Sequence, residues 1–98
     1  MSDDVRARIE ATRGLVQHSD LAAHVSRDAV LVVSAELDLV DCGLAIAGND
    51  VARIETWIGA STLRKPTADE LALWGTDEGR RWVAVVVQPY VLVQDPND

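Results

Sequence analysis

Two apolar, β-branched segments near the end of the chain constrain the fold more than any other feature. Residues 82–87 read Trp-Val-Ala-Val-Val-Val and residues 90–93 read Tyr-Val-Leu-Val, with only Gln88-Pro89 between them. Runs of this composition predict strands that are buried on both faces. Pro89 has no N–H group for a sheet ladder, so the chain has to turn or bend there. Proline cannot adopt the positive φ of the usual two-residue hairpin turns. A hairpin and a bent strand therefore both stay open, and the hairpin is slightly favoured.

Helical periodicity dominates most of the remaining sequence. Three amphipathic or buried helices are predicted at about residues 4–14, 37–47 and 51–58. Two shorter helices are expected after Ser19 and Thr67, which are good N-cap residues, and Thr67 forms a capping box with Glu70. Residues 29–33, Ala-Val-Leu-Val-Val, predict one more buried strand. The fold class is therefore α+β, with a small sheet of about three strands covered by four or five short helices.

Length and charge narrow the classes of function. The 98 residues make one domain, 1–98, with loose ends expected at 1–4 and 95–98. Sixteen acidic residues against nine Lys and Arg give a formal net charge of −7. This balance argues against nucleic acid and against anionic membrane surfaces as partners. The apolar runs are shorter than the roughly 20 residues of a membrane helix. No signal-peptide pattern opens the chain, and a single cysteine excludes an internal disulfide, so a cytoplasmic location is predicted.

No constellation of catalytic residues is evident, and the protein is predicted not to be an enzyme. The sequence has no glycine-rich phosphate-binding motif and no nucleophile elbow. Cys42 lies among apolar residues, where burial makes a thiol unreactive. His18 and His24 are six residues apart, which is not the spacing of a zinc site. We therefore expect no catalytic residue, no metal and no cofactor.

Three carboxylates nevertheless form a candidate binding site. Glu36, Asp38 and Asp41 lie close together, and the last two are three residues apart on one helix face. Such a group binds a divalent cation or a small ligand when other elements add ligands. A simpler interpretation is that negative charge there stabilises the helix N-terminus. The basic pairs at 64–65 and 80–81 fit either an anion site or a solvated surface.

The few aromatic residues admit two interpretations. Tryptophan and tyrosine fill protein cores, and they are also enriched at protein interfaces. Core filling is slightly favoured for the three tryptophans. The interface candidates are Trp57, Trp74, Trp82, Pro89 and Tyr90.

The order of these segments resembles a family of small bacterial proteins, chiefly from proteobacteria, that is catalogued as a domain of unknown function. The resemblance rests on the strand at 31–33, the Leu-Asp-Leu-Val motif at 37–40 and the ending at 82–94, Trp-Val-Ala-Val-Val-Val-Gln-Pro-Tyr-Val-Leu-Val-Gln. A tryptophan is usual in that family where Tyr90 stands, and an alanine where Gln88 stands. The resemblance implies a stand-alone bacterial cytosolic domain and supplies no catalytic residues.

Three functional hypotheses follow. The first is a non-catalytic protein-binding or self-associating module, a homodimer, because apolar edges of a small sheet invite pairing with another chain. Its interface would lie at residues 83–93 or on the faces of Trp57 and Trp74. The alternative is a domain that binds a small ligand or a divalent metal through the three carboxylates. A minor alternative is an acidic inhibitor of a nucleic-acid-binding protein, which requires one contiguous negative face.

Overall fold

A computed structural model describes residues 2–77 and 79–95 of the chain. The helices are α1 (Ser2–Ala11), α2 (His18–Ser26), α3 (Leu39–Ala47), α4 (Val51–Gly59) and α5 (Ala68–Thr76). The strands are β1 (Gly14–Gln17), β2 (Val30–Val33), β3 (Leu63–Arg64), β4 (Arg81–Val87) and β5 (Tyr90–Gln94). They form one mixed sheet in the order β1-β4-β5-β2-β3. The α+β class and the helices are confirmed, whereas the predicted number of about three strands is wrong because the sheet has five.

The β4–β5 hairpin is confirmed and forms the centre of the sheet. The two strands pair antiparallel, with Val85 opposite Leu92 and Val87 opposite Tyr90. The Gln88–Pro89 peptide bond is cis, a geometry that places proline in a tight turn without a positive φ. β1 pairs with the outer side of β4, and β2 runs parallel to β5.

The two strands that the sequence does not predict, β1 and β3, are the edges of the sheet. β1 has four residues and β3 only two, which is too short for a recognisable alternation of apolar and polar residues. Gly14 was expected to end the first helix, but α1 ends at Ala11 and Gly14 begins β1. β4 and β5 are interior strands, since β1 pairs with residues 81–84 of β4 and β2 pairs with residues 91–93 of β5. Most of the hairpin's outer backbone is therefore used within the sheet, and an interface along residues 83–93 stays a prediction.

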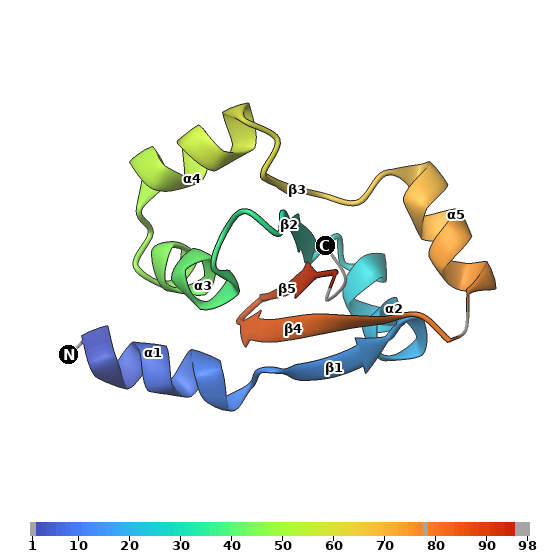
Figure 1. Cartoon of the computed structure of the whole chain (residues 1–98), viewed down its shortest axis with the longest axis horizontal. Helices are drawn as coiled ribbons and strands as arrows, with labels where there is room; N and C mark the ends of the chain where they lie inside the picture. Colours follow the sequence, from blue (N-terminus) through green and yellow to red (C-terminus); the bar gives the residue numbers. More distant parts are fainter. Residues whose placement is uncertain (1, 78, 96–98) are drawn as a thin grey trace.

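Helices cover both faces of the sheet (Figure 1), with α1, α3 and α4 on one side and α2 and α5 on the other. Alternate side chains of the hairpin point to opposite faces of the sheet, so they contribute to two hydrophobic cores, one on each face. Val85 and Leu92 pack with Cys42 of α3 on the first face, while Trp82 packs with Trp74 of α5 on the second. None of the helices in the described ranges is long and apolar enough to span a bilayer.

Local capping explains where the helices begin, with one correction. Thr67 forms the predicted capping box with Glu70 at the start of α5. The expected cap at Ser19 is wrong: the N-cap is Gln17, two residues earlier, and its N–H donates to the Asp20 carboxylate at 2.9 Å. Of the predicted loose ends, residues 2–4 belong to α1, whereas 1 and 96–98 lie outside the described residues.

Gly43 allows α1 to pack closely on α3. A Cβ atom at this position would lie 3.1 Å from Cγ2 of Ile9 in α1 and 3.1 Å from Cγ2 of Val87 in β4. Both neighbours are β-branched and stiff at χ1, so they cannot move aside easily. The packing of the first core therefore requires the smallest residue here.

We predict that Gly43→Val lowers the free energy of unfolding by about 1–3 kcal/mol, because the added methyl groups overpack this contact. Urea denaturation followed by far-ultraviolet circular dichroism measures the change. Gly59→Ala is the matched control, since no atom lies within 4 Å of a Cβ at that position. It should leave stability within about 0.5 kcal/mol or raise it slightly. If the Gly43 variant were as stable as the wild type, the packing of α1 and β4 against this position would not require glycine.

Candidate functional site

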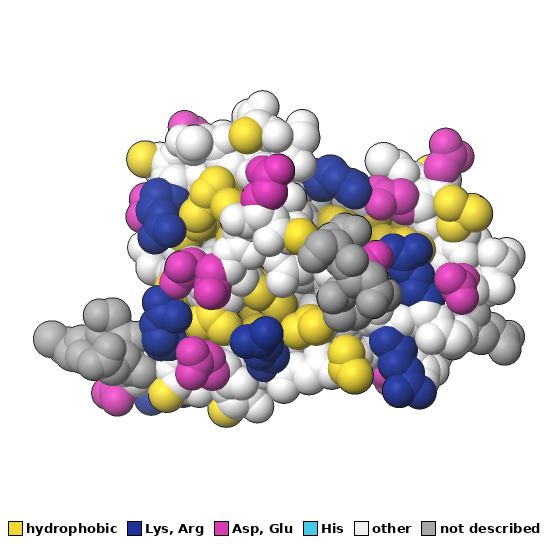
Figure 2. All heavy atoms as spheres, viewed as in Figure 1, with side chains coloured by type: hydrophobic (Ala, Val, Ile, Leu, Met, Phe, Trp, Pro, Cys, Tyr) yellow, Lys and Arg dark blue, Asp and Glu magenta, His cyan; other side chains and the backbone are white. Residues whose placement is uncertain are grey.

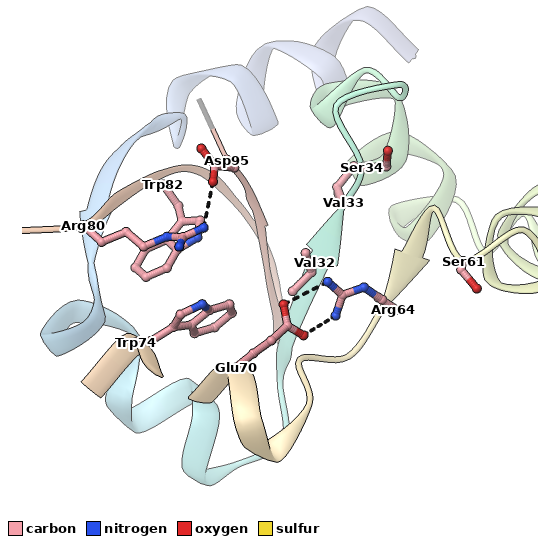
Figure 3. A pocket seen from close by; sticks show the side chains of 10 residues that line it. All are labelled: Val32, Val33, Ser34, Ser61, Arg64, Glu70, Trp74, Arg80, Trp82 and Asp95. Atoms are coloured by element: carbon pink, nitrogen blue, oxygen red, sulfur yellow. Dashed lines mark hydrogen bonds and ion pairs between the residues drawn. The ribbon is translucent and has the colours of Figure 1, made fainter. Parts of the chain in front are cut away.

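A polar hollow of about 270 Å³ opens on the sheet face that carries α5. Its main lining residues come from β3, α5, the start of β4 and the end of β5 (Figure 3). They are Arg64, Glu70, Trp74, Arg80, Trp82 and Asp95. Residues far apart in the chain thus meet in one small volume.

One wall of the hollow is the ion pair between Arg64 and Glu70. Both guanidinium Nη atoms donate to the carboxylate, and Arg64 Nη2 lies 2.9 Å from Glu70 Oε2. The hydrogen bond from Arg64, with help from the Thr67 backbone, lowers the pKa of Glu70 to about 2. Arg64 belongs to the edge strand and Glu70 to α5, so this pair fastens the helix to the sheet.

The opposite wall is built on Arg80. Its Nη2 donates to Asp95 Oδ2 at 2.7 Å, and its guanidinium lies over the Trp82 ring at 5.2 Å from the centroid. Trp82 in turn contacts Trp74, with ring centroids 4.7 Å apart and planes inclined by 56°. The hollow therefore combines two arginine–carboxylate pairs with two buried indole rings.

A second, larger hollow is apolar. This groove, of about 550 Å³, lies between α3, α4 and the strands β2, β3 and β5. Its apolar lining is Leu31, Ile46, Ile54, Ile58, Leu63 and Tyr90. Lys65 lies at its margin and donates to Asp28 Oδ2 at 2.5 Å, a contact that raises the pKa of Lys65.

The three predicted carboxylates have separate structural surroundings. Asp38 is the N-cap of α3, and its Oδ1 accepts the backbone N–H groups of Val40 and Asp41. Asp41 pairs with Arg6 of α1 at 2.6 Å, and Glu36 is exposed. Across the described part of the chain, no group of three or more His, Cys, Asp or Glu is placed to hold a metal ion. Binding of a ligand by these three residues stays a prediction.

The interface candidates divide into two sets. Trp74 and Trp82 are 4% and 2% exposed, so they fill the core and present only a small part of their surface to the polar hollow. Tyr90 lines the apolar groove, and Pro89 is exposed at the turn beside it. Trp57 is half-buried on α4 under the Arg53 guanidinium.

Other candidates from the sequence are also located. Cys42 is fully buried, and burial raises the pKa of its thiol to about 11, which disfavours the reactive thiolate. The two residues of each basic pair, 64–65 and 80–81, have different surroundings. Arg64 and Arg80 both line the hollow, whereas Lys65 bonds Asp28 and Arg81 is exposed. Nothing in the spacing of Arg64, Glu70 and Arg80 marked them as neighbours.

We predict that Glu70→Gln destabilises the protein by about 1–2 kcal/mol near neutral pH, after allowance for solvent screening. Since the pKa of Glu70 is lower in the folded state than its ordinary 4.5, its stabilisation is complete above about pH 4.5. It is lost as the pH falls through about 2. The difference in stability between wild type and variant should therefore shrink over this interval in urea titrations. Asp69→Asn controls for loss of a negative charge in the same helical turn. A difference independent of pH would contradict the prediction.

Comparisons with known proteins agree with the fold. The chain is similar to the protein PA1075 from Pseudomonas aeruginosa, a structure solved by NMR in solution, with 27% identity and a TM-score of 0.81. The likeness covers 97% of this chain and 87% of that one. Among curated proteins, none matches. A family model described as "Protein of unknown function (DUF2288)" matches residues 4–95, which confirms the expected membership in a family of unknown function. The chain belongs to this family.

Proposed function

We propose that the protein is a non-catalytic association module that functions as a homodimer, joined through the apolar groove beside α4. We call this the α4 surface, and it consists of the groove, which includes Ile58, together with Val51. The dimer follows the prediction from the sequence, but its proposed surface is at α4 instead of at residues 83–93, where β1 and β2 already pair with the hairpin.

The observation that carries this proposal is the incomplete cover of α4. The helix is amphipathic, yet none of its residues is buried. Ile58 lines the groove and is 56% exposed, and Val51, seven residues earlier on the same helix face, is 50% exposed. Exposed apolar patches of this kind mark interaction sites in soluble proteins. A second copy would cover the helix and fill the groove in one contact.

Charge supports a second copy as the occupant. The chain as a whole carries −7, so two copies repel each other over most orientations. The α4 surface is close to neutral, because α4 has one arginine and one glutamate, and the cations of the groove are paired. Arg64 bonds Glu70, and Lys65 bonds Asp28. A two-fold axis here brings the same patch of each copy together, with Ile58 of one facing the groove of the other.

The other hypotheses receive less support. An acidic inhibitor needs one negative face, but Figure 2 shows acidic and basic side chains interspersed on the face in view. The proposed absence of catalysis is supported by the burial of Cys42 and by the structural contacts of Asp38 and Asp41. The bacterial source and the cytoplasmic location remain predictions from the sequence.

We expect the wild-type protein to be a dimer that dissociates on dilution, in native mass spectrometry or sedimentation equilibrium. Ile58→Glu should raise the dissociation constant by at least about tenfold, because it buries a charge in the apolar contact. Leu73→Glu is the matched control: this leucine is 67% exposed on α5, away from the groove, and its variant should dimerise like wild type.

Two results would overturn the homodimer. One is a wild-type protein that stays monomeric at millimolar concentration. The other is dissociation by Leu73→Glu with no effect of Ile58→Glu, which would move the interface to another surface. Thermal unfolding of both variants shows whether the monomers are still folded.

A further inference from the structure

The polar hollow lies where sheets with parallel strands usually bind ligands. β2 and β5 are the parallel pair, so their carboxyl ends meet at one edge of the sheet. Ser34 follows β2 directly, Asp95 follows β5, and both line the hollow (Figure 3). In open sheets, ligands bind in the crevice outside the carboxyl ends of such strands. The hollow therefore lies at a sheet edge of the kind where ligand sites are built, and its side chains have to show what it could bind.

The charges in the hollow select the kind of ligand. Arg64 and Glu70 on one wall and Arg80 and Asp95 on the other sum to zero. A simple anion would give the hollow a net negative charge beside Glu70 and Asp95, and a simple cation would give it a net positive charge beside Arg64 and Arg80. A zwitterion meets neither obstacle, because its negative group adds to a guanidinium and its positive group to a carboxylate.

Both kinds of group keep capacity for further bonds. A guanidinium has five N–H donors, and Arg80 gives Nη2 to Asp95. A carboxylate has about four lone-pair sites, and Glu70 uses three of them to accept two hydrogen bonds from Arg64 and one from the Thr67 N–H. A ligand can therefore bond to both walls while the two ion pairs stay intact.

The volume of the hollow and its two indole rings restrict the class of ligand further. The volume of about 270 Å³ lies just below the roughly 300–1,000 Å³ of sites for drug-sized molecules. Trp74 and Trp82 form an apolar wall between the charged groups, as Figure 3 shows. We propose that the hollow binds a small zwitterion of the α-amino acid class with an apolar side chain. Its carboxylate bonds Arg80, its ammonium group bonds Glu70, and its side chain packs on Trp74.

The test uses L-leucine as the probe and the indole N–H signals of the full-length protein in NMR titrations. The signals of Trp74 and Trp82 should shift in a saturable way, whereas Trp57, on α4, is an internal control that should not move. L-Leucinamide lacks the carboxylate and 4-methylpentanoate lacks the ammonium group. Each should bind at least about tenfold more weakly, because each loses a charged hydrogen bond.

A variant pair tests the assigned contact. Arg80→Gln should weaken L-leucine binding by about tenfold or more, and Arg81→Gln, one residue away and exposed, should not. The comparison of the three ligands on the wild-type protein holds even if Arg80→Gln fails to fold. Absence of a saturable shift at millimolar L-leucine would overturn the proposal. Equal binding of 4-methylpentanoate would overturn it too, since the hollow would then be an anion site.

Discussion

The pairing of β4 with β5 is the contact on which the rest of the structure depends. Its side chains are buried on both faces of the sheet. Val85 and Leu92 are 0% exposed on one face, and Val93 is 0% exposed on the other face. A hairpin that is apolar on both faces is insoluble alone, and it needs a helical layer on each side. The helices α3 and α5 supply these layers, and β1 and β2 pair with the two remaining backbone edges.

The two surface hollows follow from how unevenly the helices cover the sheet. On one face α3 packs centrally, while α4 stands further out against β3 and leaves Leu31 and Tyr90 at the bottom of a groove. On the other face α5 meets the sheet through Trp74 and through the ion pair of Glu70 with Arg64. The space between this helix and the ends of the parallel strands is the polar hollow. The groove is apolar because aliphatic side chains of α3 and α4 line it, whereas two arginines and two carboxylates line the polar hollow.

The sequence predicted what local chemistry determines. The hairpin, the buried strand at 30–33 and the capping box at Thr67 depend on neighbours within a few residues, and the sequence predicts each of them. The edge strands could not be predicted, because β1 and β3 are extended only where they pair with β4 and β2, which lie far from them in the sequence. The charged hollow could not be predicted either. Arg80 and Asp95 are fifteen residues apart, and only the return of β5 along β4 brings them together.

The two-residue strand β3 connects the two proposed surfaces. Successive strand residues point to opposite faces, so Leu63 turns to the first core and Arg64 turns toward Val32 on the second face. The long side chain of Arg64 nevertheless reaches the margin of both hollows. A substitution of Arg64 would therefore disturb self-association and ligand binding together and could not separate them. Ile58 lines only the groove and Arg80 only the hollow, so the two functions are separable at these positions.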